Sequence, residues 1–213
     1  MYQNITYTGK RSPAFMHVKM AADKDGKFLA LEGDNYVDHG PYSEFGDLLT
    51  LRLSQFTGAG YDIRNTRNKS QTVCTNHAWG SAFRGYGSPQ SFMGSEVCID
   101  VLAEKMGIDP FELRYKNIYR AGTGCTTPTG QEPEVFCLEE MYEKARPVYY
   151  EAKERLAKMN TDKLKYGVGF ASGVYGCGLD GKDSSFANIQ LNPDGTCTVF
   201  HAWEDHGQGA DIG

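Results

Sequence analysis

The sequence predicts an α+β protein of two mixed α/β domains, the second of which is cut short after its first strands. Strand and helix patterns alternate over the first three quarters of the chain, and strand patterns dominate the last quarter. A polar segment at 159–165 separates these two regions. We therefore expect a first domain at 1–160 and the beginning of a second domain at 161–213.

A hairpin is expected near the start of the chain. Residues 14–22 and 27–36 form two extended runs, and the Asp-Lys-Asp-Gly segment between them is a strong turn signal. Apolar residues at helical spacing then predict a helix over 43–57, with Ser43 as its possible cap and glycines after its end.

The middle of the chain predicts a short strand and two helices. The strand is expected at 70–76, and Ser88, followed by a proline, is a good cap for a helix that Gly107 would end. Asp109, followed by a proline and then a glutamate, begins another helix in capping-box fashion. That helix is expected to run to about Tyr119.

The remaining elements lie on either side of the polar segment. A long loop is expected at 120–137, and the helical pattern at 138–158 contains Pro147, which predicts a kink or two short helices. Residue patterns typical of β-strands follow in GVGFASGVYG, FANIQLN and TCTVFHAW. A Pro-Asp-Gly turn between the last two segments predicts a second hairpin. The final glycine-rich turn leads into no further element, so we expect the chain to be a fragment of a longer protein.

Composition narrows the range of functions. The 213 residues are 40% hydrophobic and 23% charged, as in soluble globular proteins. A net charge of −5 without a basic stripe argues against nucleic acid as a partner, and no apolar run approaches the roughly 18 residues of a membrane span. Because the N-terminus lacks the layout of a signal peptide, we expect a cytoplasmic protein, with periplasmic export of a parent protein left open.

Neither the cysteines nor the histidines predict a metal site. The six cysteines form no CxxC pair, and their spacings match no zinc or iron–sulfur template. The five histidines are scattered along the chain. We therefore expect no side chain of this chain to ligate a metal.

Two glycine-rich motifs are candidates for ligand binding. The segment AFRGYGSPQ at 82–90 places a guanidinium, an aromatic ring and two glycines just before a helix N-terminus, where unpaired N–H groups attract anions. The segment HGQG at 206–209 follows a strand, and its alternating glycines suit an anion-binding turn. On these residues alone, an ordinary helix cap and an ordinary strand-to-helix turn are the competing interpretations. A third glycine cluster at 175–181 is uninformative by itself.

Together, these segments resemble the xanthine dehydrogenase and aldehyde oxidase family. AFRGYGSPQ is similar to the family signature AFRG(F/Y)G-x-PQ, with Ser88 in place of a commoner glycine. DPFELRYKN at 109–117 is similar to DP-x-E-(L/V)-R-x-x-N, and HGQG is similar to (H/M)GQG. The segments at 10–49 and 174–181 most resemble the bacterial mononuclear molybdenum aldehyde oxidoreductases.

The resemblance implies two cofactor-binding domains that hold a molybdenum cofactor between them. In this family the metal is held by a pterin dithiolene, which agrees with the absence of a ligand pattern in the sequence. The residues implied to contact the cofactor are Phe83, Arg84, Gly85, Gly207, Gln208 and Gly209. The implied cofactor is molybdopterin cytosine dinucleotide with molybdenum, and [2Fe–2S] clusters are expected only in the intact enzyme.

The resemblance also implies a substrate channel with apolar or aromatic walls. The implied channel residues are Phe45, Leu48, Tyr86 and Leu179. Such walls suit an uncharged aldehyde, because a charged substrate would lose its hydration there without gaining a partner. Arg52, one helical turn after Leu48, is a nearby cation that could orient a heterocyclic ring, although a solvent-facing or salt-bridged arginine is the simpler interpretation.

The activity implied by the family is the oxidation of an aldehyde with water to a carboxylic acid. This chain lacks the family's glutamate base and its iron–sulfur domains, so the resemblance assigns it no catalytic residue and predicts a fragment that is inactive by itself. The expected partners are a small aldehyde and the remaining domains of a parent enzyme that is a homodimer when intact. Two alternatives stay open: a hydroxylase acting on N-heterocycles, and a non-functional truncated remnant.

Overall fold

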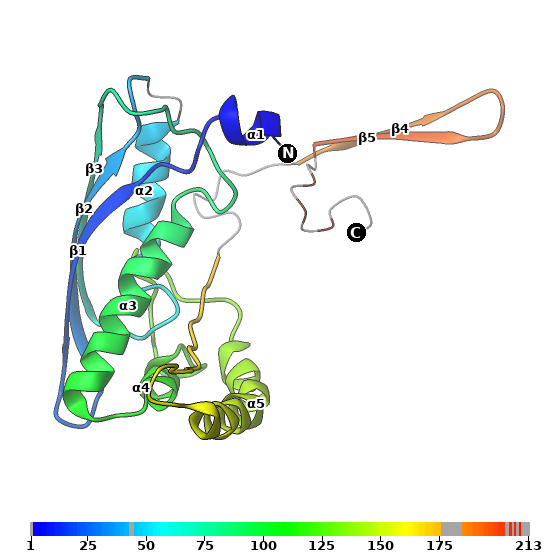
Figure 1. The fold of residues 1–213 in the computed structure, drawn as a ribbon. Coiled ribbons are helices and arrows are strands. Elements are labelled where there is room, and N and C mark those ends of the chain that lie inside the picture. The colour runs from blue at the N-terminus through cyan, green and yellow to red at the C-terminus, as the bar shows by residue number, and fades with distance from the viewer. Residues whose placement is uncertain are drawn as a thin grey trace. The chain divides into compact units, whose positions relative to one another are not determined.

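The computed structural model describes residues 2–42, 45–175, 185–202, 205, 207 and 209. The chain divides into two compact units, Met1–Tyr175 and Gly176–Gly213. The first unit combines helices with a sheet, and the described part of the second contains a two-stranded hairpin, as Figure 1 shows. The predicted α+β class is confirmed.

The first unit is built around a three-stranded sheet in the order β1-β2-β3. β1 (Ala14–Ala22) pairs antiparallel with β2 (Phe28–Asp38), which confirms the first predicted hairpin, and β2 pairs parallel with β3 (Asn65–Val73). The Asp23 carboxylate accepts two main-chain hydrogen bonds within the hairpin turn. The prediction of a strand at 70–76 was wrong in its bounds, because the first residues of β3 are polar and show no apolar alternation.

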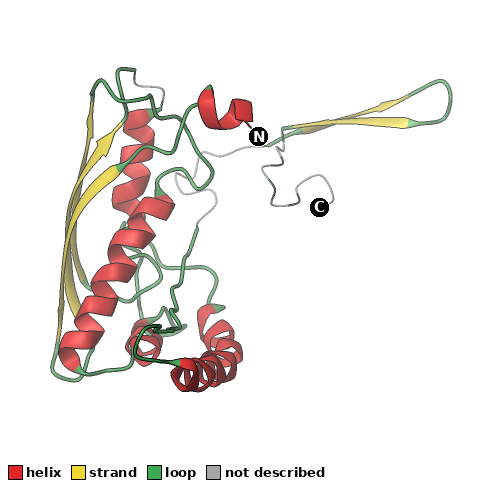
Figure 2. Cartoon of the chain, viewed as in Figure 1, coloured by secondary structure: helices red, strands yellow, loops and turns green. Residues whose placement is uncertain are grey.

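Two helices cover one face of this sheet. α2 (Gly46–Phe56) packs on β2 and β3, and α3 (Ser88–Met106) packs on β1 and α2. Figure 2 shows the resulting two layers, with strands on one side and helices on the other. Leu31 and Val37 of β2 are buried on the helix side, because alternate residues of a strand point to the same face. A short helix, α1 (Tyr2–Thr6), precedes the sheet.

The starts of α2 and α3 differ from the predicted ones. α2 follows Phe45, which occupies the left-handed region at φ 57°, and the predicted cap Ser43 lies outside the described residues. α3 is preceded by Gly87 at φ 94°, so Ser88 is the first helical residue rather than the cap. Its hydroxyl donates back to the carbonyl of Gly85 at 2.6 Å.

The later helices follow the sequence more closely. Gly107 ends α3 as predicted, and Asp109 caps α4 (Pro110–Asn117), which stops before the predicted end near Tyr119. α5 (Leu138–Met159) is one helix rather than two, with Pro147 inside it. Pro147 lies on the exposed side of α5, where water can satisfy the carbonyl that loses its hydrogen bond.

The segment after α5 belongs to the first compact unit. It was expected to be a linker followed by a strand, but its described part at 160–175 forms no strand. Instead, Phe170 packs against Phe111 with ring centroids 4.7 Å apart, and Tyr175 stacks on Phe56. The alternating apolar residues of this segment therefore contact a core rather than a neighbouring strand. The domain boundary near residue 160 stays a prediction.

The second unit contains the second predicted hairpin. β4 (Ala187–Leu191) pairs antiparallel with β5 (Cys197–His201), and the turn between them closes with Gly195 at φ 85°. Ile189 and Val199 face each other across the strands, and both side chains are exposed. Of the helices that lie in the described ranges, none has the length and apolar character needed to cross a membrane.

Candidate functional site

The loop before α3, residues 82–87, has an unusual backbone, and we call it the signature loop. Gly85, Tyr86 and Gly87 are three successive left-handed residues, at φ 89°, 46° and 94°. Two tight turns shape the loop, in which Tyr86 N donates to Phe83 O at 2.8 Å and Ser88 N donates to Gly85 O at 3.0 Å. A left-handed non-glycine residue such as Tyr86 is uncommon and strained, and such residues concentrate at functional sites.

The two glycines of the signature loop are required by close contacts. A Cβ atom on Gly87 would lie 2.5 Å from the carbonyl oxygen of Leu49 in α2. A Cβ atom on Gly85 would lie 2.7 Å from the Pro89 ring. Within the described chain, the main-chain N–H groups of Gly85 and Gly87 find no acceptor. The loop therefore combines a close approach to α2 with two main-chain N–H groups that no acceptor in the described chain uses.

Most of the predicted channel residues meet at the N-terminus of α2. The Tyr86 hydroxyl donates to the carbonyl of Phe45 at 3.2 Å, and its ring packs against the buried side chains of Leu49 and Leu53. Burial raises the pKa of Tyr86, so the phenol remains a donor at neutral pH. Phe45 and Leu48 are 55% and 49% exposed, one helical turn apart, which leaves an apolar surface beside the signature loop.

The predicted cofactor contacts fall in both units. Phe83 is 47% exposed and Arg84 is exposed, so their side chains project from the first unit. Gly207 and Gly209, in the second unit, are left-handed at φ 96° and 85°. Gln208 and the predicted channel residue Leu179 lie outside the described residues.

A buried carboxylate that the sequence did not reveal supports the chain leading into the signature loop. Asp38, at the end of β2, accepts hydrogen bonds from the Thr75 hydroxyl at 2.6 Å and the Gly40 N–H at 3.0 Å, and contacts His77 Nδ1 at 2.5 Å. These hydrogen bonds, led by that of Thr75, lower the pKa of Asp38 to about 2. The carboxylate is therefore ionised at neutral pH and fixes the start of the connection from β3 to α3.

The second family signature, 109–117, has two fully buried polar side chains, those of Arg114 and Asn117. Arg114 has no exposed surface and donates to Glu96 Oε2 of α3 at 2.6 Å. Asn117 is equally buried, and its side chain bonds the main chain of Gly26 and of Phe28 at the first hairpin. These contacts join α3, α4 and the hairpin, so this signature supports the fold.

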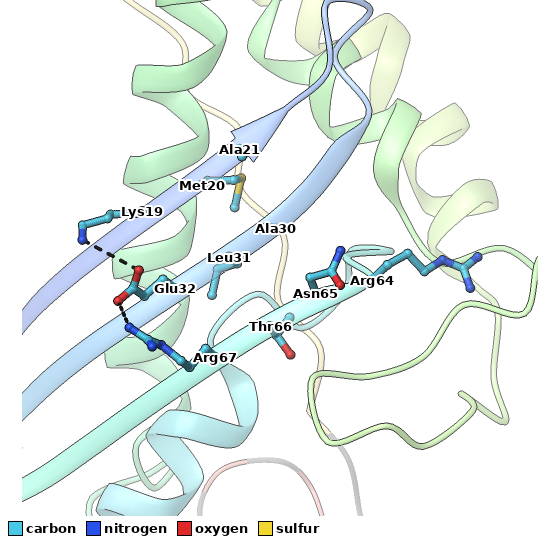
Figure 3. Close-up of a pocket in the computed structure, with 10 residues that line it drawn as sticks. All are labelled: Lys19, Met20, Ala21, Ala30, Leu31, Glu32, Arg64, Asn65, Thr66 and Arg67. Carbon is cyan, nitrogen blue, oxygen red and sulfur yellow. Dashed lines mark hydrogen bonds and ion pairs between the residues drawn. The ribbon is translucent and has the colours of Figure 1, made fainter.

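A separate hollow lies across the strands of the sheet and has a volume of about 610 Å³. Figure 3 shows a row of charges across it, in which Glu32 pairs with Lys19 and with Arg67. Its lining includes none of the predicted site residues. The described ranges also contain no group of histidine, cysteine, aspartate or glutamate side chains that could hold a metal ion.

Two family models, each described as a molybdopterin cofactor-binding domain, match residues 1–118 and 144–213. The chain belongs to the molybdopterin cofactor-binding domain family, within the xanthine dehydrogenase and aldehyde oxidase group. It is 64% identical, over 99% of its length, to the aldehyde oxidoreductase of Megalodesulfovibrio gigas.

The chain is also similar to a second, solved aldehyde oxidoreductase and to a more distant relative. The solved aldehyde oxidoreductase of Desulfovibrio desulfuricans is 58% identical over 98% of this chain, with a TM-score of 0.89. The nicotinate dehydrogenase large molybdopterin subunit of Eubacterium barkeri is 33% identical over 68% of this chain and is covered to 34% of its length. The chain spans only 23% of the length of each aldehyde oxidoreductase.

Proposed function

We propose that this chain is the cofactor-binding part of a molybdenum enzyme that oxidises aldehydes with water to carboxylic acids. The 64% identity to an aldehyde oxidoreductase over nearly the whole chain is the observation that carries the proposal. The proposed cofactor is the cytosine dinucleotide form of molybdopterin. The parent enzyme is proposed to be a cytoplasmic homodimer whose other domains hold the [2Fe–2S] clusters.

The signature loop has donors that fit such a cofactor. The N–H groups of Gly85 and Gly87 have no acceptor in the described chain, and the exposed guanidinium of Arg84 lies beside them in the sequence. Main-chain N–H groups and an arginine fork suit the phosphate and carbonyl oxygens of a pterin nucleotide. Phe83, Arg84 and Gly85 are therefore proposed as contacts from the first unit. The contacts proposed from the second unit are Gly207, Gln208 and Gly209.

The residues of this chain are proposed to bind and orient, while the bound cofactor supplies the redox chemistry. Phe45 and Leu48 are proposed as apolar walls of the channel that exclude water from it, and Leu179, outside the described residues, is proposed as a further channel residue. Tyr86, held by its bond to the Phe45 carbonyl, closes the wall beside the cofactor contacts. Turnover requires a general base from elsewhere in the parent enzyme, because the resemblance assigns none to this chain.

Hydroxylation of an N-heterocycle is the competing function, and the 33% identity to a nicotinate dehydrogenase subunit is the observation that favours it. Such a function needs a polar or charged group that orients the ring. Arg52 is half-buried and donates to Gln55 at 3.1 Å along the same helix, so its guanidinium already has a partner within α2. The exposed apolar side chains of Phe45 and Leu48 suit a neutral aldehyde better.

Steady-state kinetics of the parent enzyme on neutral aldehydes, xanthine and nicotinate would test the proposal. We expect aldehydes to be preferred, and we expect Leu48→Arg to lower kcat/KM for aldehydes about tenfold or more, because an unpaired cation would enter the channel. Val101→Arg is the matched control, since Val101 of α3 is 46% exposed and Leu48 is 49% exposed. A preference for xanthine would contradict the aldehyde assignment. Equal kinetics in Leu48→Arg and Val101→Arg would contradict the proposed channel.

A further inference from the structure

The segment before β1 runs alongside the chain that leads into the signature loop. Lys10 forms a parallel bridge with Gly80, and Ser81 N donates to the Lys10 carbonyl at 3.0 Å. These bonds place the next residue, Arg11, next to the start of the loop. No sequence motif links Arg11 to the loop, because 73 residues separate it from Arg84.

Arg11 contacts the signature loop in two ways. Its guanidinium carbon lies 4.7 Å from the centroid of the Phe83 ring, and its Nη2 donates to the carbonyl oxygen of Arg84 at 2.6 Å. Nη1 also reaches Gln90 Oε1 at 3.5 Å, while Gln90 Nε2 donates to Ser12 O at 3.0 Å. Arg11 therefore connects the beginning of the loop with the first turn of α3, on both sides of the left-handed residues.

The charge on Arg11 has no carboxylate partner in the described part of the chain. Its guanidinium is half-buried, and burial lowers its pKa. An arginine whose contacts are a ring, a carbonyl and an amide forms no ion pair, and its effect is to fix the positions of these groups. The strained left-handed backbone of Tyr86, between two left-handed glycines, persists only when surrounding contacts fix it.

We propose that Arg11 is a positioning residue for the signature loop. By stacking on Phe83 and binding the Arg84 carbonyl, it holds the loop in the conformation that leaves the Arg84 guanidinium exposed. The inference rests on the proposed function, because the ligand that this conformation serves is the molybdenum cofactor. It adds to that function a residue outside the three signature motifs at 82–90, 109–117 and 206–209, to which the sequence alone gave no role.

The test compares Arg11→Gln and Arg11→Lys with Arg120→Gln in the full-length parent enzyme. Arg120 is the control from another place in the unit, because its guanidinium also lies over an aromatic ring and donates to a main-chain carbonyl, and it differs from Arg11 in its ion pair with Glu139. Its guanidinium lies 4.8 Å from the Tyr115 ring and donates to the Tyr115 carbonyl at 2.7 Å. Three quantities are measured: amide hydrogen exchange of the peptide at 80–90, molybdenum per chain, and the thermal midpoint.

We expect Arg11→Gln to speed exchange at 80–90 about tenfold or more and to lower molybdenum content, with other peptides unchanged. Arg11→Lys should give an intermediate result, because lysine keeps the charge but lacks the planar fork. Arg120→Gln should leave both the exchange at 80–90 and the molybdenum content at wild-type values.

Wild-type exchange at 80–90 in both Arg11 variants would overturn the inference, and so would equal molybdenum loss in Arg120→Gln. If Arg11→Gln does not fold, Arg11→Lys decides by the same criteria. A wild-type enzyme that purifies without molybdenum would instead refute the proposed function. In that case the exchange measurements would still decide whether Arg11 positions the loop.

Discussion

The signature loop at 82–87 and the second signature at 109–117 are both typical of the family, but the structure gives them different surroundings. The loop is exposed at 82–84, contains three left-handed residues at 85–87, and leaves two N–H groups without acceptors in the described chain. In the second signature, Asp109 caps α4, and Arg114 and Asn117 are completely buried with their polar atoms bonded. We propose that the strained loop with its unused donors binds the cofactor, whereas the fully bonded second signature supports the fold.

Arg114 makes the central contacts of the buried second signature. Burial alone would lower the pKa of Arg114, but the carboxylates of Glu96 and Asp100 outweigh it and raise the pKa. Glu96 also accepts a hydrogen bond from the Tyr61 hydroxyl at 2.6 Å, and Tyr61 contacts Ser172. The network therefore joins α3, α4 and the segment that leads to the end of the first unit.

Arg114→Ala should have the largest effect on stability. It leaves the buried carboxylate of Glu96 without its cation, which typically costs about 3–5 kcal/mol. We expect a large fall in the thermal midpoint and in the soluble yield of the parent enzyme, with molybdenum lost only in proportion to folded protein. A variant with wild-type stability would show that the second signature does not support the fold.

Gly87→Ala should have an intermediate effect on stability and a large effect on the cofactor. The new methyl group would meet the Leu49 carbonyl at 2.5 Å, in addition to the strain of a left-handed alanine, which costs about 1–3 kcal/mol. Gly122→Ala is the control, because Gly122 is also left-handed, at φ 73°, and has open space around it. Molybdenum analysis should show a loss in Gly87→Ala alone; equal retention in both would mean that the loop tolerates displacement from α2.

The sequence predicted the elements that local chemistry determines. Both hairpins form at their Asp-Gly turns, and Asp109 caps α4, because each of these signals acts within a few residues. β3 and the segment at 160–175 were predicted less well. The polar residues of β3 form a strand because they pair with β2. The segment at 160–175 is held by contacts with distant aromatic rings. A local sequence pattern shows neither of these interactions.

The motifs in the sequence named the candidate site, which stays a prediction, and they did not give its geometry. The resemblance named Phe83, Arg84 and Tyr86, and the structure adds that Tyr86 is left-handed and bonded to Phe45. The supports from Asp38 and Arg11 could not be predicted, because they cross from the sheet and the N-terminal segment to the loop. Such contacts depend on tertiary structure, and no spacing in the sequence encodes them.

Arg84→Lys should have the smallest effect on stability and is the most direct test of the central claim, that the signature loop binds the cofactor. Arg84 is exposed, so its replacement should leave the thermal midpoint of the parent enzyme unchanged within about 1 kcal/mol of stability. Lysine cannot reproduce the paired donors of a guanidinium, so the molybdenum content per folded chain should fall. A variant that keeps the wild-type molybdenum content would contradict the assignment of this loop to the cofactor.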